Sequence, residues 1–306
     1  MHILYRNISL PLVQHFYDEL TSTLTYVVRD PESSSCAIID SVLDLDYASG
    51  TISYGSADKV VSYIESQKLT VEWILETHVH ADHLSAAPYL QGRLGGRIAI
   101  GDQIRVVQEK FGEIFNETDR FARDGSQFDV LLAEGDEFSI GGMKVRPMHT
   151  PGHTPACMSY LIGDAVFVGD TLFMPDYGTA RCDFPGGDAS TLFRSIQRIL
   201  ELPADTRIFL CHDYRPDGRP MAFDTTVAEQ LASNVHIGGG KSEGDFVRMR
   251  EARDATLDMP TLILPSLQVN MRAGHVPPAE SGEKFFLKIP LNAFGGDDLR
   301  RLAGKG

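Results

Sequence analysis

The sequence THVHADH at residues 77–83 follows VEWIL at residues 71–75, an apolar run with the length and composition of a buried strand. Three imidazoles and a carboxylate are therefore expected close together where this strand ends. Neutral imidazole and carboxylate are nitrogen and oxygen ligands that transition metals prefer in proteins, so the stretch predicts a metal site. The alternative is a surface cluster of polar residues at a junction between a strand and a helix.

Further candidate ligands follow other apolar runs. His153 comes after one such run, Asp170 closes AVFVGD, and His212 closes IFLCH. Strand ends that converge on one edge of a sheet hold ligands rigidly, and the joint occurrence of these residues favours ligation. Taken alone, His153 could instead stabilise a turn and Asp170 could cap one. Asp40 also ends an apolar run, and we expect it to orient a ligand imidazole rather than to serve only in a turn.

The bulk composition limits the classes of function. The 306 residues can bury a sizeable core, and 42% hydrophobic with 23% charged residues is ordinary for a globular protein. The formal net charge of −14 argues against nucleic-acid and anionic-membrane partners. The sequence has four cysteines without CxxC spacing, no secretory signal and no membrane-length apolar stretch, so we expect a reducing, cytoplasmic location.

The order of apolar runs predicts two groups of strands with helices between them, and hence a layered α/β sandwich with helices outside. Two-residue hairpin turns are expected at Gly141-Gly142 and Gly163-Asp164, and a helix at about residues 189–200. From about residue 225 the chain turns helical and charged. We expect a catalytic domain over residues 1–235 and a C-terminal extension, residues 236–306, that packs on it.

Over most of residues 20–215, the order His-x-His-x-Asp-His followed by His153, Asp170 and His212 resembles the metallo-β-lactamase superfamily. The resemblance implies an αββα sandwich with the metal site at one edge. Members of the superfamily hydrolyse β-lactams, thiolesters and phosphodiesters, open lactones or oxidise sulfur. The fold alone therefore leaves the reaction open.

Finer motifs look like the persulfide dioxygenase branch, whose members are sulfur-oxidising relatives of glyoxalase II, and the tail from Asp258 to Ala279 resembles the bacterial members of that branch. The resemblance implies that a low-molecular-weight persulfide reacts with O2 and water to give sulfite and the free thiol, in sulfide detoxification. Glutathione is the expected carrier thiol, and coenzyme A or another small thiol is the alternative. The motifs that carry the resemblance are ETHVHADHLSAA at residues 76–87, TPGHTPAC at 150–157, GDTLF at 169–173, RCDF at 181–184 and CHDY at 211–214.

The resemblance implies one Fe(II) per chain, held from one side by His78, His153 and Asp170, with positions left open for a persulfide and O2. His212 would assist catalysis. The ligands of a two-metal hydrolase are all present as well, so a pair of zinc or iron ions, as in a thiolester hydrolase of the glyoxalase II type, is the alternative. The residues that would surround the iron or hold the second metal are His80, Asp82, His83, His212 and Asp40.

The substrate side of the site is expected to use Arg181, Tyr177, Arg215 and Cys182. For Arg181 the alternative is an ion pair with Asp183 or Asp176 that fixes the loop. Tyr177 could simply pack, and Cys182 could be a buried small thiol. The expected partners are the persulfide, O2 and further copies of the chain in a homodimer or larger homo-oligomer.

Overall fold

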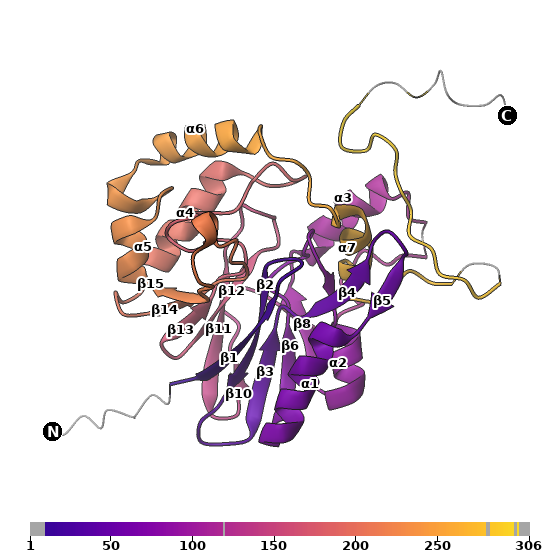
Figure 1. The fold of residues 1–306 in the computed structure, drawn as a ribbon, viewed down its shortest axis with the longest axis horizontal. Helices are drawn as coiled ribbons and strands as arrows, with labels where there is room; N and C mark the ends of the chain where they lie inside the picture. Colours follow the sequence, from indigo (N-terminus) through magenta and orange to yellow (C-terminus); the bar gives the residue numbers. More distant parts are fainter. Residues whose placement is uncertain (1–9, 119, 280–281, 297–298, 300–306) are drawn as a thin grey trace.

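The computed structural model describes residues 10–118, 120–279, 282–296 and 299. Two six-stranded sheets pack face to face, and helices cover the outer face of each sheet (Figure 1). The expected αββα sandwich is therefore confirmed. No helix within the described ranges is long and apolar enough to cross a membrane.

The first sheet has the order β1-β2-β3-β6-β8-β9 and the second runs β10 to β15 in sequence order, while β5-β4-β7 form a small third sheet. The first sheet consists of β1 (Leu12–Asp18), β2 (Thr23–Arg29), β3 (Ser35–Ile39), β6 (Thr70–Leu75), β8 (Arg97–Gly101) and β9 (Val130–Leu132). The second consists of β10 (Phe138–Ile140), β11 (Met143–His149), β12 (Met158–Ile162), β13 (Ala165–Phe167), β14 (Arg207–Phe209) and β15 (Asp224–Thr226). The third consists of β4 (Val42–Asp46), β5 (Thr51–Ser53) and β7 (Leu84–Ser85).

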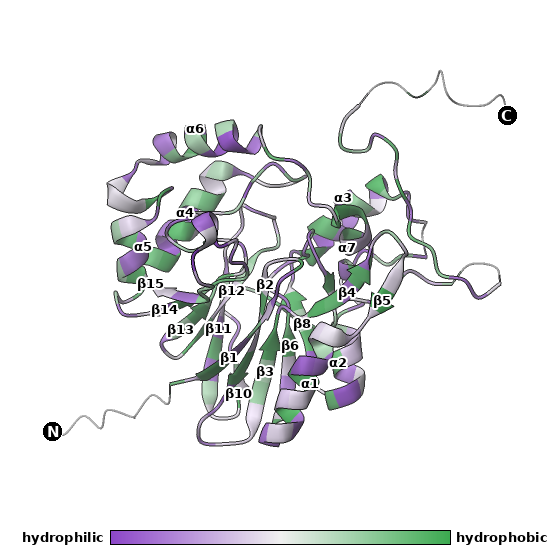
Figure 2. Cartoon of the chain, viewed as in Figure 1, coloured by the Kyte–Doolittle hydropathy of each residue, from purple (hydrophilic) through white to green (hydrophobic). Residues whose placement is uncertain are grey.

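Strands of the first sheet are apolar on both faces because both faces are covered. In β2, Leu24, Tyr26 and Val28 point between the two sheets, and Val27 points toward the helices. Figure 2 shows the central strands as largely hydrophobic, whereas the helices are hydrophobic on one side and hydrophilic on the other. This is the pattern that sheets between helix layers require.

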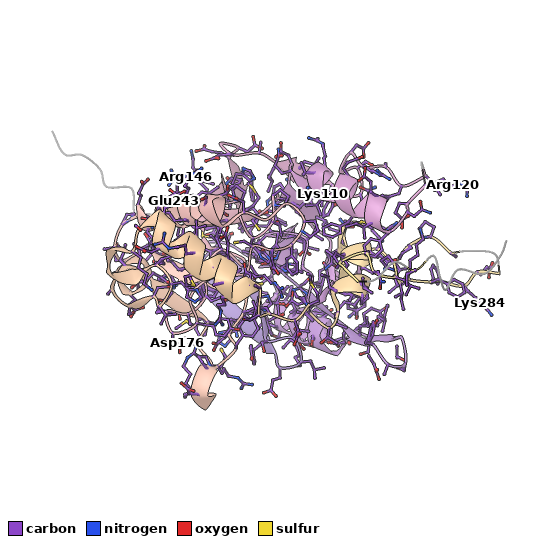
Figure 3. The ribbon with its side chains drawn as sticks, turned by 90° about the horizontal axis from the view of Figure 1, so that it is seen from above. Lys110, Arg120, Arg146, Asp176, Glu243 and Lys284 are labelled. Carbon is purple, nitrogen blue, oxygen red and sulfur yellow. The ribbon has the colours of Figure 1, made fainter. Side chains whose placement is uncertain are left out.

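One helix layer covers each sheet. Buried side chains of α1, α2, α3 and α7 join the core of the first sheet, and those of α4, α5 and α6 join the core of the second. The helix bounds are α1 (Gly55–Gln67), α2 (Ala87–Leu94), α3 (Ile104–Ile114), α4 (Ala189–Leu200), α5 (Val227–Ser233), α6 (Glu243–Asp254) and α7 (Ile263–Asn270). In Figure 3, charged residues such as Lys110, Arg146 and Glu243 lie at the periphery.

Local sequence signals agree with the structure where the chain turns tightly. Ile140 pairs with Met143, so Gly141 and Gly142 form the two-residue turn that was expected. Gly163 and Asp164 form the second such turn, between β12 and β13. The helix expected at about residues 189–200 is α4, which Asp188 caps by accepting a hydrogen bond from the Thr191 amide.

Parallel pairing brings the functional strand ends together. β3 pairs in parallel with β6, and β13 pairs in parallel with β14. Parallel neighbours end at the same edge of a sheet. The segments that follow these four strands carry Asp40, the residue 77–83 cluster, Asp170 and His212.

Candidate metal centre

Three histidines, His78, His80 and His83, lie in the connection between β6 and β7 and are at most 1% exposed. The connection between β11 and β12 adds His153, and the segments after β13 and β14 add Asp170 and His212. All three of these added residues are buried as well. The structure thus brings the ligands expected from the sequence into one buried cluster.

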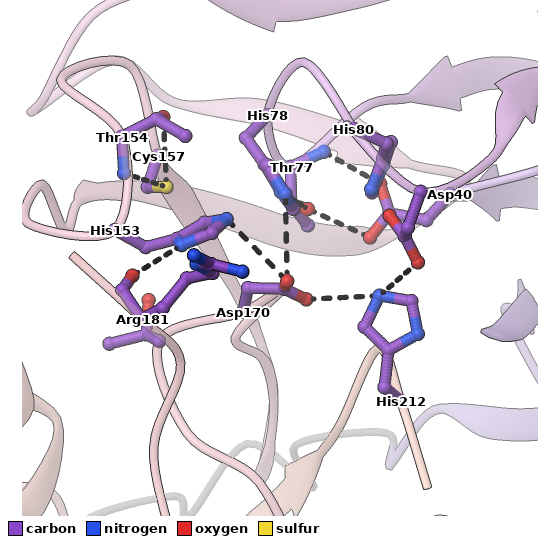
Figure 4. Close-up of polar contacts among 12 residues, drawn as sticks. Asp40, Thr77, His78, His80, His153, Thr154, Cys157, Asp170, Arg181 and His212 are labelled. Carbon is purple, nitrogen blue, oxygen red and sulfur yellow. Dashed lines mark hydrogen bonds and ion pairs between the residues drawn. The ribbon is translucent and has the colours of Figure 1, made fainter. Parts of the chain in front are cut away.

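Two histidines and one carboxylate form a compact group at the centre of this cluster. His78 Nε2 lies 3.9 Å and His153 Nε2 lies 3.6 Å from Oδ2 of Asp170. One ligand atom from each residue lies within 4.8 Å of the other two. Figure 4 shows the two imidazoles directed at the Asp170 carboxylate. This spacing suits three ligands of a single metal ion.

The far nitrogen of each of these imidazoles is held by a hydrogen bond. Thr77 donates its hydroxyl to Asp40 Oδ2 at 2.8 Å, which leaves the Thr77 oxygen free to accept from His78 Nδ1 at 3.0 Å. His153 Nδ1 donates to the Arg181 carbonyl at 2.7 Å. Both Nε2 atoms are therefore left as acceptors that face Asp170, which is how proteins orient histidine ligands of metals.

The packing of Asp170 against this group depends on the glycine before it. Gly169 has a φ of +52°, and a Cβ atom there would lie 2.5 Å from Thr77 Oγ1. Any side chain at this position would both strain the backbone and push Thr77 away from His78. Gly169 thereby allows the strand end to deliver Asp170 to the histidines.

A second set of donor atoms lies beside the first. His212 Nε2 is 3.3 Å from Asp82 Oδ2 and 3.3 Å from Asp170 Oδ1. Ligand atoms of His80, Asp82 and His83 lie within 4.8 Å of one another. Asp170 therefore lies between the two sets of donor atoms, which is the position expected of a carboxylate shared by two metal ions.

Buried polar atoms without partners test whether a metal fits. The described residues offer no hydrogen-bond partner to several buried donor atoms of the cluster, a costly state in the absence of a cation. Burial lowers the pKa of His78 well below its usual range and that of His83 to about 4, so both imidazoles are neutral and able to ligate. The unpartnered atoms are His78 Nε2, His80 Nδ1, Asp82 Oδ2, His83 Nε2, Asp170 Oδ1 and His212 Nε2.

Two buried carboxylates hold His80. Its Nε2 lies 3.0 Å from Asp40 Oδ1 and 3.4 Å from Glu76 Oε2. Burial works to lower the pKa of His80, but the neighbouring Asp40 and Glu76 carboxylates outweigh it and raise that pKa well above its usual range. Nε2 faces these two carboxylates and Nδ1 has no partner among the described residues, so Nδ1 is the atom of His80 that would ligate a metal after losing its proton. Sequence reasoning missed Glu76, although an acid at a buried strand end directly before the histidines was a usable signal.

Helix α7 supports the histidine segment from far along the chain. The Asn270 side chain donates to the carbonyls of His80 and His83 at 2.9 and 2.7 Å and accepts from the Ser85 amide at 2.8 Å. These groups are buried, so water does not replace Asn270. No local pattern at residue 270 indicated this contact. It is visible only once the chain is folded.

The family is decided by comparison with known proteins. The model of the metallo-beta-lactamase superfamily matches residues 19–212, which is more than half of the chain. The chain belongs to this superfamily. The resemblance found in the histidine motifs is thereby confirmed.

Relatives within the superfamily carry different descriptions. A probable metallo-hydrolase of Burkholderia pseudomallei is 56% identical and covers 92% of this chain and 99% of its own length. Glyoxylase B2 of Dictyostelium discoideum is 49% identical over 92% of this chain and 97% of its own. The mitochondrial persulfide dioxygenase ETHE1 of Homo sapiens is 28% identical over 86% and 89%. The crystal structure of ETHE1 from Myxococcus xanthus matches with a TM-score of 0.69 at 30% identity, over 86% of this chain and all of that one.

The candidate metal centre opens into a cavity of about 190 Å³. Asp82, His153 and Asp170 form its floor, and aromatic and basic residues form its walls. The wall residues are Phe173, Tyr177, Arg181, Phe184, Tyr214, Arg250 and Arg253. Tyr177, expected to meet substrate, lies in this wall and is half-buried, so that role stays a prediction.

Arg181 lines the cavity, but its guanidinium is already engaged. Nε and one terminal nitrogen donate to the two carboxylate oxygens of Asp183 at 2.6 and 2.7 Å, and the other donates to the Asp258 carbonyl at 2.6 Å. This is the ion pair that we considered as the alternative role. Arg181 fixes the loop whose carbonyl holds His153, and a direct substrate contact stays a prediction.

The structure places Arg215 and Cys182, both expected to meet substrate, outside the residues that line the cavity. The Arg215 guanidinium packs over the Tyr17 ring at 5.2 Å and does not line the cavity. The Cys182 side chain is buried in the core between the second sheet and its helices. Burial raises the pKa of its thiol well above the usual range. Cys182 is therefore an inert core thiol rather than a reactive group.

Proposed function

We propose that this protein is an iron-dependent persulfide dioxygenase that uses O2 and water to convert a low-molecular-weight thiol persulfide to sulfite and the free thiol. The observation that supports this most is the compact group of His78, His153 and Asp170. Two imidazoles and one carboxylate on one side of a metal are typical of non-haem Fe(II) oxygenases, because the opposite positions stay open. Glutathione persulfide is our first candidate substrate.

The residues present fit an Fe(II) ion, and their roles follow from their contacts. His78 and His153 would supply neutral nitrogen ligands, Asp170 would supply the negative charge, and the bound iron would supply the redox change that activates O2. Thr77 and Asp40 keep the proton on Nδ1 of His78, so that its Nε2 stays available. The same hydrogen bonds fix the orientation of the His78 ring.

The cavity walls are suited to a sulfur substrate. Phe184 packs edge-on against the His153 ring with centroids 5.5 Å apart, and Phe173 lines the same cavity. Apolar walls limit water around a persulfide anion and strengthen electrostatic contacts inside the site. His212 Nε2 lies 3.3 Å from Asp170 Oδ1 and would hold or release a proton at that carboxylate.

A dinuclear thiolester hydrolase of the glyoxalase II type is the second candidate. It is favoured by the unpartnered donor atoms of Asp82, His83 and His212, which form a second ligand set. Relatives described as a probable metallo-hydrolase and glyoxylase B2 also favour it. Two metals would then hold a hydroxide as the nucleophile.

Two assays on one preparation separate the candidates. The protein is purified without oxygen, reconstituted with Fe(II) and offered glutathione persulfide in air-saturated buffer. We expect sulfite and O2 uptake in equal amounts, because one O2 supplies two of the three oxygens of sulfite. Hydrolysis of S-D-lactoylglutathione without sulfite from any persulfide would instead establish the hydrolase.

A further inference from the structure

Three arginines line the cavity above the metal centre, and they differ in what their charges meet. Arg250 is buried and pairs with Asp254 at 2.6 Å. Arg181 is held by Asp183. Arg253 is exposed, and no carboxylate of the described ranges lies within 4.0 Å of its guanidinium. Arg253 is thus the cavity arginine whose charge is left for a ligand.

A row of aromatic rings connects Arg253 to the metal centre. The Arg253 guanidinium carbon lies 5.7 Å from the centroid of the Tyr177 ring. Tyr177 lies 4.6 Å from the Tyr214 ring, which in turn stacks on His212 with centroids 5.6 Å apart. The cation–π contact holds the guanidinium over the cavity wall at little entropic cost. Arg253, His153 and Asp170 line one cavity, so a ligand that reaches Arg253 can keep its other end at the metal.

One side of the site adjoins acidic residues. A second hollow of about 550 Å³ shares Asp82, Tyr214 and Asp258 with the cavity and is also lined by Asp18 and Asp44. The chain as a whole carries a net charge of −14. An anionic group is therefore repelled on this side and attracted toward Arg253.

We infer that Arg253 binds a carboxylate of the carrier thiol and thereby selects small peptide-like thiols over neutral ones. This inference rests on the proposed function, because it places the sulfur end of the carrier at His78, His153 and Asp170. A guanidinium donates two parallel hydrogen bonds to a carboxylate, which makes arginine suited to this role. Arg253 lies on α6, far in sequence from the metal ligands, and its guanidinium packs on Tyr177 rather than on a ligand.

Binding of two ligands to two forms of the protein tests the inference without measuring turnover. S-Methylglutathione, which has no free thiol, and its diethyl ester are titrated calorimetrically into the wild type and Arg253→Gln. Loss of a charge-assisted hydrogen bond predicts about tenfold weaker binding of the acid to the variant. The ester lacks the carboxylates, so both proteins should bind it equally. Added salt should weaken binding of the acid to the wild type more than to the variant.

Arg248→Gln is the matched control, because Arg248 lies on the same helix, is exposed and pairs with Asp245. It should bind S-methylglutathione as the wild type does. With glutathione persulfide, Arg253→Gln should raise KM about tenfold and leave kcat within about twofold, since the lost contact is the same in ground and transition states.

Several results would overturn the inference. These are equal binding of the acid by wild type and Arg253→Gln, an equal loss for acid and ester, or no measurable binding of S-methylglutathione to the wild type. Tighter, Arg253-dependent binding of S-methyl-coenzyme A would assign the contact to phosphate instead. Failure of the proposed function would be a separate result. If the wild type forms no sulfite but binds S-methylglutathione through Arg253 as expected, the Arg253 contact stands and the protein catalyses another glutathione-linked reaction.

Discussion

The buried end and the mouth of the same cleft are built in opposite ways. At the buried end, His78 and His153 each have one nitrogen fixed by a short hydrogen bond and the other directed at Asp170. At the mouth, Arg253 and Tyr177 belong to different segments, and the Arg253 guanidinium lies 5.7 Å from the centroid of the Tyr177 ring. The ligands of the buried end are therefore fixed by hydrogen bonds, whereas Arg253 at the mouth is held by a ring contact.

The comparison indicates where mutations act. Changes at the buried end should remove metal or destabilise the fold, because each group there has a partner that would be left buried and unpaired. Changes at the mouth should alter the affinity for the carrier thiol or the pH dependence of stability, and they should leave the metal in place. The following predictions test this division in order of decreasing effect.

The largest effect is expected from Asp170→Ala. The carboxylate is shared by both ligand sets, so its removal should abolish iron retention and lower turnover more than about 100-fold, beyond what loss of a supporting contact costs. Metal analysis and sulfite formation measure the two effects. Asp205→Ala, at an exposed aspartate, is the control and should keep both. Wild-type iron content in Asp170→Ala would refute the ligand assignment.

Asn270→Ala tests whether α7 supports the buried end. The substitution leaves the His80 and His83 carbonyls and the Ser85 amide without partners. We expect the free energy of unfolding to fall by about 3 kcal/mol in urea denaturation. Gln67→Ala, at an exposed helix end, should change it by less than about 0.5 kcal/mol. A similarly small change at Asn270 would mean that the histidine segment holds its shape without α7.

Asp40→Asn tests the support of the ligands without removing one. Asp40 has a φ of +51°, a conformation that asparagine also tolerates, so the backbone should be kept. Loss of the charge beside His80 and Thr77 should weaken iron binding about tenfold or more, as measured by competition with a chelator. Unchanged iron affinity would show that Asp40 serves only the turn.

The effect expected to be smallest near neutral pH is a pH dependence of stability in the segment that supports the cavity residue Thr179. His236 accepts a hydrogen bond from the Thr179 amide, and burial lowers its pKa from 6.5 to about 3. The unfolded state therefore binds more protons between these two values, and stability should fall as the pH is lowered from 6.5 toward 3. The contribution is at most about 1.4 kcal/mol per pH unit. His236→Asn should show a shallower slope in urea unfolding, and an equal slope would exclude His236 as its source.

The sequence was sufficient for the sandwich and for the buried end of the site. Strands covered on both faces are apolar throughout, and the ligands directly follow such strands, so local pattern and chemistry agree there. The hairpin turns at residues 141–142 and 163–164 were predictable because two residues decide each of them.

Tyr177 and Arg181 of the cavity wall were expected from the sequence, but Arg253 and the support from α7 were not. Arg253 and Asn270 reach the site only through tertiary packing, and an exposed arginine in a charged helix has no local mark of function. Arg215 was expected at the site because it follows His212 closely, but its side chain turns to Tyr17. The division into residues 1–235 and 236–306, the homo-oligomer and the cytoplasmic location stay predictions.

Metal content per chain tests the central claim most directly. The protein is purified without oxygen from cells supplied with both iron and zinc, and iron, zinc and protein are quantified in the same sample. One iron per chain, with zinc far below one, is the result that we predict for His78, His153 and Asp170. Two metal ions per chain in the active protein would contradict the mononuclear iron site and support the dinuclear hydrolase.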